Sequence, residues 1–372
     1  MFEPHDESEL TELVSAAQTP LAVRGGNTRG IVHNAEGVTT KNLSGISLYE
    51  PGALTVVVKA GTTVTELNNA LAEENQRLAF EPMDYRSLLK TTGEPTVGGV
   101  VAANVSGPRR IAVGGCRDFL LGVRFVNGLG KVIKNGGRVM KNVTGYDLVK
   151  LMAGSYGTLG ILTELSLKVL PRPETEVTII LHDLDDRTAV GAMSKALGSP
   201  YEVTGAACLP IKKQTVLRLE GFEDSLKYRT KKLTELLGGF GDLDVISSSH
   251  NSAKVWHEIR DVIPFHGLDG DVWRFSVKPS DGPEIVEKLN IKDVIYDWGG
   301  GLVWIRSPKN IDIRAKAGAF CGHATLVRAE PETYKHVRMF QPENSPIAAL
   351  STGLRAKFDP RGILNQGLMS AD

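Results

Sequence analysis

The stretch EPTVGGVVAANVSGPRRIAVGGCRDFLLGVRFVNGLG (94–130) decides the fold, because its glycines and other small residues are interleaved with valines. Small side chains over about a dozen positions leave room for a flat ligand to lie against the backbone. Thr96, Asn104 and Ser106 add neutral hydrogen-bonding groups. The alternative is a mobile loop, but a mobile loop would rarely be interleaved with residues such as Val97. The stretch therefore indicates a ligand-binding segment.

Two further glycine clusters lie on either side of this stretch. RGGNTRG (24–30) directly follows the short strand LAV (21–23). Closely spaced glycines let successive backbone N–H groups form a concave nest that binds phosphate oxygens without net positive charge. Arg24 and Arg29 would support such a site, and a plain tight turn is the alternative. The third cluster, GSYGTLGI (154–161), reads by itself as a helix stop and turn. The first cluster does not match G-x-G-x-x-G, and the chain contains no P-loop motif. The sequence therefore argues against a dinucleotide-binding fold and a P-loop nucleotide site.

Composition excludes several classes of protein. The 372 residues are 41% hydrophobic and 23% charged, with 43 basic and 43 acidic side chains, so no global basic field recruits nucleic acid or anionic lipid. Three distant cysteines argue against a disulfide framework or a cysteine-ligated metal cluster. The acidic opening is unlike a signal peptide, and no run of about 20 apolar residues predicts a membrane span. We expect a cytoplasmic protein with no integral membrane segment.

Local patterns predict the elements of the first part of the chain. The hydrophobic periods indicate a helix at 10–17, strands at 21–23, 54–60, 78–80, 119–126, 131–135 and 161–171, and a helix opened by the capping box Thr63-x-x-Glu66. Asn127-Gly128 is a hairpin signal between two of these strands. PRPE (171–174) interrupts the pattern, and we place a domain boundary there.

Beyond that boundary the glycine clusters become sparse, and strands alternate with helices in the order β-α-β-β-α-β, given twice. This order predicts a large, mostly antiparallel sheet with helices on one face. The last residues carry another glycine-punctuated stretch, KFDPRGILNQGLM (357–369), which we expect to return to the first domain. The predicted organisation is a first domain at 1–172, a second at 173–345 and a returning segment at 346–372.

In order along the chain, these motifs resemble the FAD-binding domain shared by vanillyl-alcohol oxidase, p-cresol methylhydroxylase (PCMH) and the D-lactate and glycolate dehydrogenases. RGGNTRG resembles the pyrophosphate loop and 94–130 the long second signature; KNVTGYDLVKLMAGSYGTLGILTELSLKVLP (141–171) resembles the end of the domain, and FDPRGILNQG (358–367) the C-terminal return. Within the family, the chain is most similar to FAD-binding subunits of bacterial glycolate oxidases. The resemblance implies an α+β fold: a two-subdomain PCMH-type FAD-binding domain plus an α/β cap domain, which carries the large sheet.

The resemblance also implies which residues bind FAD. Those expected at the pyrophosphate are Arg24, Gly25, Gly26, Asn27 and Thr28. Those expected along the pyrophosphate and isoalloxazine are Pro82, Thr96, Val97, Gly98, Gly99, Asn104, Ser106 and Gly107. Those expected at the ribose and adenine end are Gly157, Gly160 and Ile161, and Asn365 would approach the flavin ring.

Two departures from the family pattern shape the expected chemistry. Covalent members carry His in the loop after the glycine pair, where this chain has Asn27, so imidazole attachment is excluded there. Cys116 reads as a small buried cysteine, and the expectation is non-covalent FAD. Many D-2-hydroxy-acid dehydrogenases of the family hold a divalent metal with an H-x-G-D-G-N-x-H motif. CGHATLVRA (321–329) offers only His323, and we predict no metal site.

Catalytic candidates come from predicted strands of the second domain. Arg274, Arg306 and Arg328 could each pair with a substrate carboxylate bidentately, although a solvated strand residue is the simpler interpretation for each. His323 or His266 could accept the hydroxyl proton.

Three functions remain open from the sequence. The first is the FAD-binding subunit of a glycolate- or D-lactate-oxidising complex, with a homologous FAD-binding catalytic-type subunit and an iron–sulfur subunit as partners. Such partners would allow peripheral association with the inner membrane. The second is a stand-alone FAD-dependent dehydrogenase of another alcohol or 2-hydroxy acid. The third is a flavin-bearing assembly subunit without turnover of its own.

Overall fold

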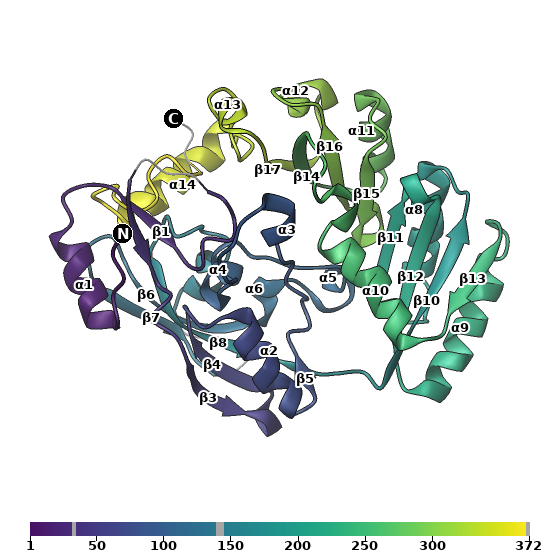
Figure 1. Ribbon diagram of the computed structural model, residues 1–372, viewed down its shortest axis with the longest axis horizontal. Coiled ribbons are helices and arrows are strands. Elements are labelled where there is room, and N and C mark those ends of the chain that lie inside the picture. The colour runs from purple at the N-terminus through teal and green to yellow at the C-terminus, as the bar shows by residue number, and fades with distance from the viewer. Residues whose placement is uncertain (32–34, 139–144, 370–372) are drawn as a thin grey trace. The chain divides into compact units, whose positions relative to one another are not determined.

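The computed structural model describes residues 1–31, 35–138 and 145–369 and divides the chain into two compact units (Figure 1). The first unit comprises Met1–Ser106, Gly114–Arg172 and Pro342–Asp372. The second comprises Gly107–Val113 and Pro173–Gln341. The chain thus leaves the first unit within the long signature stretch, contributes seven residues to the second unit, and returns. Positions 141–144, which open the third motif, lie outside the described residues.

The first unit is built on a five-stranded antiparallel sheet in the order β3-β4-β8-β6-β7. Its strands are β3 (Ile46–Glu50), β4 (Thr55–Lys59), β6 (Leu120–Val126), β7 (Val132–Gly136) and β8 (Ile161–Lys168). A parallel pair, β1 (Leu21–Arg24) and β2 (Glu36–Thr39), and a short pair, β5 (Gln76–Arg77) and β9 (Leu170–Pro171), complete its strands. Its helices are α1 (Glu7–Ala16), α2 (Val64–Glu73), α3 (Arg86–Leu89), α4 (Val97–Ala102), α6 (Cys116–Phe119), α7 (Leu148–Met152) and α14 (Ser345–Phe358).

Several local predictions for this unit are confirmed. β6 and β7 form the hairpin around Asn127, whose side chain accepts hydrogen bonds from the amides of Leu129 and Lys131. Thr63 caps α2 by accepting from the amide of Glu66 at 3.1 Å. Ile161 and its alternate apolar neighbours along β8 are buried, as the alternation predicted.

Other local predictions are wrong. The strand expected at 78–80 lies instead at β5, and β5 pairs with β9 and not with the β4 strand that precedes it. A two-residue strand carries too little periodicity to be located from sequence. The helix α14 was not predicted, because its 14 residues include none that is buried and therefore show no apolar stripe.

The second unit has an eight-stranded sheet in which every pairing is antiparallel, in the order β13-β10-β12-β11-β15-β16-β14-β17. The first β-α-β-β-α-β half is β10 (Thr175–His182), α8 (Asp186–Leu197), β11 (Gly205–Leu209), β12 (Gln214–Gly221), α9 (Glu223–Leu237) and β13 (Leu243–Ile246). The second is β14 (Asp271–Val277), α11 (Asp281–Leu289), β15 (Val294–Asp297), β16 (Leu302–Ser307), α12 (Ile313–Ala317) and β17 (Gly322–Arg328). The two halves meet at β11 and β15, which confirms the predicted repeat and the predicted large antiparallel sheet.

Helices cover both faces of this sheet to different extents, which corrects the expectation of helices on one face. The larger apolar cluster lies on the face covered by α8, α9, α11 and α12. A smaller cluster on the other face packs against α10 (Ser249–Arg260), a helix that sequence reasoning missed. The remaining short helices of this unit are α5 (Arg110–Val113) and α13 (Pro331–Tyr334). Among the described residues, no helix is long and apolar enough to cross a bilayer.

A buried ion pair attaches residues 107–113 to this sheet. The guanidinium of Arg109, whose residue is 2% exposed, binds both carboxylate oxygens of Glu220 on β12. Arg218 lies 3.8 Å from the same carboxylate and packs over the ring of Trp256. Because a lone charge is very costly inside a protein, the Arg109 and Glu220 side chains depend on each other.

Replacing Arg109 by Met is therefore expected to destabilise the second unit by about 3 kcal/mol, since Glu220 would lose its bidentate partner. Urea unfolding followed by tryptophan fluorescence measures this directly, because all four tryptophans (256, 273, 298 and 304) belong to this unit. Arg187→Gln, which breaks an exposed pair with Glu287 in the same unit, is the matched control and should change little. An unchanged midpoint for Arg109→Met would contradict the assignment.

Candidate functional site in the first unit

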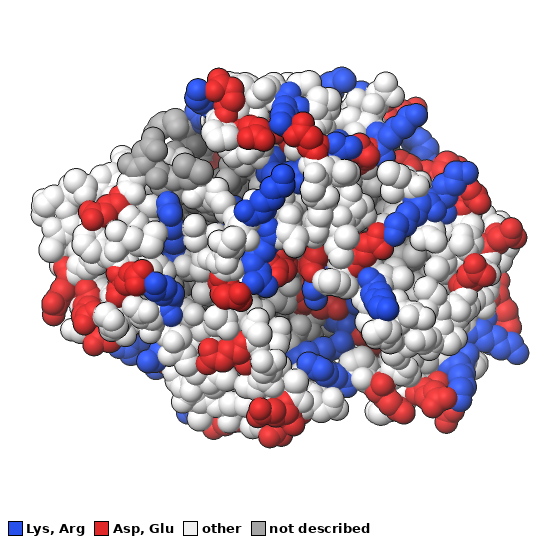
Figure 2. Space-filling view, viewed as in Figure 1, with Lys and Arg blue, Asp and Glu red and all other residues white. Residues whose placement is uncertain are grey.

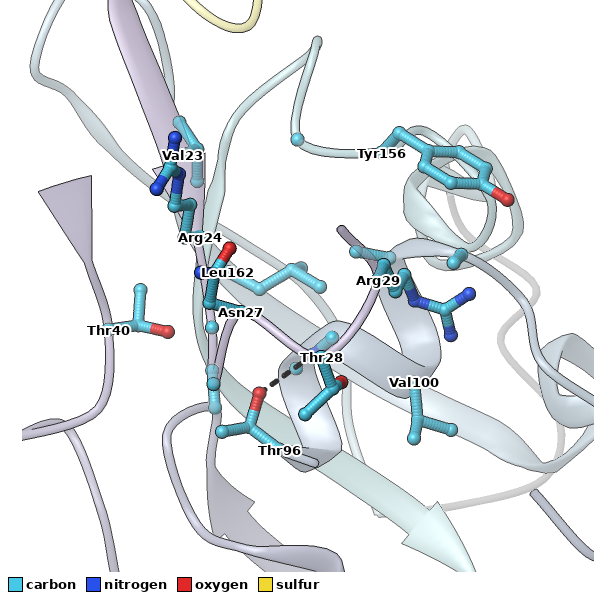
Figure 3. Close-up of a pocket in the computed structure, with 18 of the residues that line it drawn as sticks. Val23, Arg24, Asn27, Thr28, Arg29, Thr40, Thr96, Val100, Tyr156 and Leu162 are labelled. Carbon is cyan, nitrogen blue, oxygen red and sulfur yellow. Dashed lines mark hydrogen bonds between the residues drawn. The ribbon is translucent and has the colours of Figure 1, made fainter. Parts of the chain in front are cut away.

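A pocket lies in the first unit where the end of β1, the loop after it and α4 come together (Figure 3). The non-atom space in this pocket is about 980 Å³, a figure that includes open solvent. The sequence-predicted residues that line it are Arg24, Gly25, Gly26, Asn27, Thr28, Thr96, Gly98, Gly99, Gly157, Gly160, Ile161 and Asn365. All three glycine clusters therefore contribute to one cavity.

The loop after β1 presents its backbone N–H groups without protein acceptors. Among the described residues, the amides of Asn27, Thr28 and Arg29 donate to no protein atom. The carbonyls of the same loop are held by the protein: Gly25 O accepts from Thr39 Oγ1 at 2.9 Å, and Thr28 O accepts from Thr91 Oγ1 at 3.0 Å. The loop therefore offers donors to the cavity, as an anion-binding nest does.

Glycines at this site allow backbone segments to cross. A Cβ on Gly26 would lie 1.5 Å from the carbonyl oxygen of Glu94, and a Cβ on Gly93 would lie 1.6 Å from the carbonyl oxygen of Gly26. Gly98 is confined in the same way, since its Cβ would meet Ala60 O at 2.7 Å. We expected Gly98 to make room for the cofactor, but it makes room for the protein's own turn after β4. Only Gly99 fits the original expectation, because its Cβ would meet Thr96 Oγ1 alone, at 3.2 Å.

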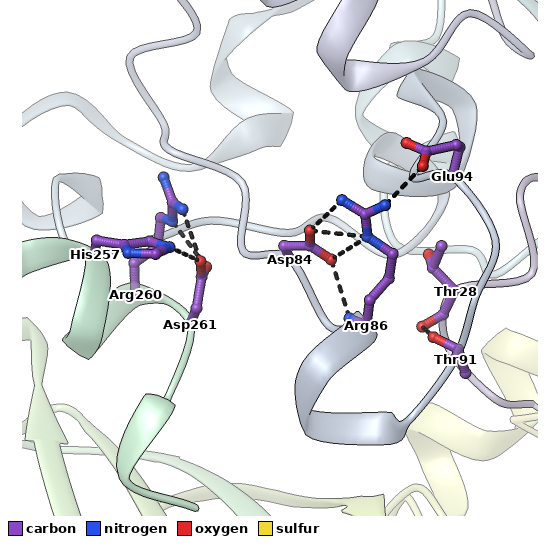
Figure 4. Close-up of polar contacts among 8 residues, drawn as sticks. All are labelled: Thr28, Asp84, Arg86, Thr91, Glu94, His257, Arg260 and Asp261. Carbon is purple, nitrogen blue, oxygen red and sulfur yellow. Dashed lines mark hydrogen bonds and ion pairs between the residues drawn. The ribbon is translucent and has the colours of Figure 1, made fainter. Parts of the chain in front are cut away.

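Ion pairs of Arg86 hold the segment around Gly93 and Glu94 that crosses Gly26 (Figure 4). The guanidinium of Arg86 binds the carboxylate of Asp84 at 2.8 Å and that of Glu94 at 2.7 Å. Hydrogen bonds with Asp84, the largest cause, raise the pKa of Arg86. Nearby, Arg29 stacks over the ring of Tyr85 at 4.5 Å, and both side chains line the pocket.

Asn365 has a role different from the one expected. Its side chain is 4% exposed, accepts from the amide of Val23 at 2.7 Å and donates to the carbonyl of Tyr156 at 2.7 Å. The side chain thus joins β1, the third glycine cluster and the C-terminal return. Asn365 lines the pocket as a positioning residue, with its polar groups directed to the protein.

Five predicted cofactor residues do not line the pocket: Pro82, Val97, Asn104, Ser106 and Gly107. The Asn104 and Ser106 side chains instead accept from the amides of Arg117 at 3.0 Å and Cys116 at 2.9 Å, so they shape the signature loop. Val97 is buried, and Gly107 belongs to the second unit. Four of these positions, all except Pro82, belong to the 94–130 motif but do not line the pocket.

The residues that sequence reasoning missed are mostly apolar or aromatic. They are Val23, Ile31, Thr40, Ala60, Met83, Tyr85, Pro95, Val100, Ala102, Ala103, Tyr156 and Leu162. An apolar residue that lines a pocket carries the same sequence signal as one in the core, so periodicity could not separate the two. Proximity to the glycine clusters was the available signal for Val100 and Tyr156. Arg29, which was expected to support the first cluster, also lines the pocket.

Three of the five catalytic candidates in the second unit are engaged in structural contacts. Arg306 pairs with Asp293 at 2.6 Å, and Arg328 donates to the carbonyls of Phe265 and Leu268. The alternative base His266 shares a 2.7 Å hydrogen bond with the carbonyl of Asp261. These contacts fix the loop before β14.

The other two candidates, Arg274 and His323, lie near each other. Loss of hydration lowers the pKa of His323, and the charges of Arg274 and Arg110 lower it further. Elsewhere in this unit, the buried Asp261 binds His257 at 2.8 Å and Arg260 at 2.7 Å (Figure 4). Within the described part of the chain, no group of three or more His, Cys, Asp or Glu residues could hold a metal ion.

The sequence is similar to those of known FAD-binding proteins. Residues 1–136 match the model of the FAD binding domain family. The chain is 35% identical to glycolate oxidase subunit GlcE of Escherichia coli (strain K12), over 98% of this chain and 97% of that one. It belongs to this family of FAD-binding oxidoreductases. Glycolate oxidase subunit GlcD of Bacillus subtilis (strain 168) is 32% identical over 46% of this chain and 36% of its own.

The fold is likewise that of known structures. An alkyldihydroxyacetonephosphate synthase superposes with a TM-score of 0.69 at 17% identity, covering 98% of this chain and 75% of that one. The predicted PCMH-type FAD-binding fold is thus confirmed.

The pocket fits FAD. Three unpaired amides suit a diphosphate, and apolar residues such as Val100, Ile161 and Leu162 suit flat rings. On the face shown in Figure 2, acidic and basic residues are interspersed and form no large basic patch. A bound diphosphate would therefore depend on the local chemistry of the nest.

Two glycine substitutions should separate the folding role of these residues from the binding role. Gly26→Ala should lower the stability of the flavin-free protein by about 2–3 kcal/mol, because the Glu94 carbonyl must move. Gly99→Val should leave that stability nearly unchanged but abolish FAD retention, because the side chain enters the cavity. Thermal unfolding of the flavin-free proteins and visible flavin absorbance of the purified ones measure the two effects.

Gly52→Ala, at a position with no neighbouring atom within 4 Å, is the control and should change neither property. Stoichiometric yellow colour in Gly99→Val would show that the α4 side of the pocket is misassigned.

Proposed function

We propose that this chain is the FAD-binding subunit of a complex that oxidises glycolate or D-lactate to the 2-oxo acid. In this proposal, electrons pass from the flavin to an iron–sulfur partner subunit, and a homologous FAD-binding subunit of catalytic type completes the complex. The observation that carries the proposal is the nest at 27–29, in a chain related over nearly its whole length to a protein named as a glycolate oxidase subunit. A relative named D-lactate dehydrogenase, from Anaerostipes hadrus, supports the same class of substrate.

The FAD is held non-covalently in this proposal. No histidine or cysteine is among the described residues that line the pocket, and Asn27 stands where covalent relatives carry His. Asn27 also has a φ of 56°, a left-handed conformation that Asn adopts more readily than most residues. Its contribution is therefore the backbone turn that directs the amides inward.

Bound FAD supplies the hydride-accepting chemistry. The amides of Asn27, Thr28 and Arg29 would hold the diphosphate, with the guanidinium of Arg24 beside it. The apolar walls of the pocket would exclude water from the rings. Asn365 keeps the third glycine cluster against β1 and so maintains the width of the site. In this proposal the complex lies in the cytoplasm and is peripheral to the inner membrane through its partners.

The second candidate is a flavin-bearing assembly subunit with no turnover of its own. The observation that favours it is the lack, among the described residues, of any metal-ligand group in the unit that carries His323. A stand-alone dehydrogenase has less support, because the full-length relative is named as a subunit.

Acid precipitation tests how the cofactor is attached. All of the flavin should appear in the supernatant as FAD, because the described residues that line the pocket include no imidazole or thiol to bond to it. Absorbance of supernatant and pellet measures the partition. Flavin retained in the pellet would disprove non-covalent binding.

Anaerobic addition of glycolate or D-lactate with a dye acceptor tests the assignment of function. Before the dye is added, the flavin absorbance of the complete complex should bleach, and the share of the bleaching that comes from this subunit should be lost when it carries Gly99→Val. Bleaching by the purified chain alone would favour a stand-alone enzyme. Unaltered bleaching in the complex with Gly99→Val would favour the assembly role and contradict the proposal.

A further inference from the structure

One loop of the first unit supports the nest. Residues 84–94, which include α3 and are here called the supporting loop, lie against the loop that follows β1. Where the two cross, a Cβ on Gly26 would lie 1.5 Å from the carbonyl oxygen of Glu94, so the backbones are in direct contact. Thr91 of the supporting loop also donates from Oγ1 to the carbonyl of Thr28 at 3.0 Å (Figure 4). The position of the nest therefore depends on where the supporting loop lies.

The supporting loop also borders the cavity. Tyr85, near its start, lines the pocket, and Cζ of Arg29 lies 4.5 Å from the centroid of the Tyr85 ring. Pro95 and Thr96, which follow the end of the loop, line the pocket as well. A shift of either end of the supporting loop would therefore change the shape of the cavity.

A single side chain joins the two ends of the supporting loop. Arg86 donates from Nε and Nη2 to Asp84 Oδ2 at 3.0 and 2.8 Å, and from Nη1 to Glu94 Oε1 at 2.7 Å (Figure 4). Since a planar guanidinium directs its donors in fixed directions, Arg86 sets the separation between positions 84 and 94. Arg86 itself does not line the pocket.

These ion pairs are too exposed to contribute much to folding. The side chains of Arg86, Asp84 and Glu94 are 32%, 34% and 55% exposed, and water weakens the attraction between charges at such positions. Other contacts hold the middle of the loop, since Leu88 is fully buried and the amide of Thr91 donates to the carbonyl of Arg86 at 3.0 Å. Loss of the guanidinium should therefore release the end at Glu94 without unfolding the loop.

We propose that Arg86 is a positioning residue for FAD, which holds the supporting loop against the nest by joining Asp84 to Glu94. The guanidinium acts on the affinity for the diphosphate through Glu94 and does not contact the cofactor. This role rests on the diphosphate lying in the nest, as in the proposed function, but not on which 2-hydroxy acid is oxidised.

Serial dilution of the FAD-loaded full chain, followed by the fluorescence of released flavin, measures the Kd for FAD. Arg86→Gln should raise this Kd about 10-fold or more, because three amide hydrogen bonds to the diphosphate depend on the position of the loop. The unfolding temperature of the flavin-free protein should fall by no more than about 2 °C. Arg138→Gln, which breaks a more exposed pair with Glu50 in the same unit, is the matched control and should leave the Kd unchanged.

A second variant separates positioning from direct attraction of the diphosphate. Glu94→Ala should also weaken FAD binding, because Arg86 then no longer reaches the end of the supporting loop. The double variant should bind no more weakly than Arg86→Gln alone, since both changes break the same contact. If Arg86 acted only by its charge, removal of the Glu94 carboxylate would instead strengthen the binding of the anionic cofactor.

Three results would each overturn the proposal. They are FAD binding by Arg86→Gln as tight as that of the wild type, tighter binding by Glu94→Ala, and a loss of stability in flavin-free Arg86→Gln that matches its loss of affinity. The measurements use neither glycolate nor a partner subunit, so these results would leave the proposed substrate and complex unaffected.

Discussion

The crossing of two backbone segments at Gly26 and Gly93 is the constraint on which the first unit depends. Each glycine lies where a Cβ would collide with a carbonyl oxygen of the other segment. The crossing brings Thr91 close enough to donate to the carbonyl of Thr28, and among the described residues the amides of Asn27, Thr28 and Arg29 donate to no protein atom. A neutral chain can bind a diphosphate here because backbone dipoles, and not net charge, supply the attraction.

The second unit is held by a buried ion pair, whereas the first depends on the close approach of two backbone segments. Arg109 fixes the short signature segment by a buried ion pair, and its neighbour Arg110 is thereby placed beside Trp298. These adjacent arginines differ in their contacts, since Arg109 forms a buried ion pair with Glu220 and Arg110 stacks on the ring of Trp298. Within the signature stretch, residues such as Gly99 belong to the cofactor pocket, while Arg109 and Arg110 belong to the other unit.

Sequence reasoning succeeded where the cause of structure is local. The hairpin at Asn127, the cap at Thr63 and the alternation along β8 each follow from residues within a few positions of one another. The β-α-β-β-α-β repeat could likewise be recognised from the order of its elements. Motif resemblance added the fold and the cofactor, whereas the close spacing of the glycines at 24–30 was the signal for the expected nest.

The remaining features depend on residues distant in sequence. That Gly98 accommodates Ala60, or that Asn365 bonds to Val23 and Tyr156, follows only from the folded chain. Asn104 and Ser106 appeared to be ligand donors because their motif is adjacent to the site, yet their side chains serve the loop itself. The three predicted arginines look alike in sequence. Only the folded chain shows that Arg306 and Arg328 bind protein groups, whereas Arg274 stacks on Trp298.

A crystal structure of the chain with FAD bound tests the central claim most directly, through the distances from the diphosphate oxygens to the nest. The account predicts that the amide nitrogens of Asn27, Thr28 and Arg29 lie about 2.7–3.2 Å from those oxygens. A diphosphate held by side chains elsewhere in the pocket, with these amides bound to water, would contradict it.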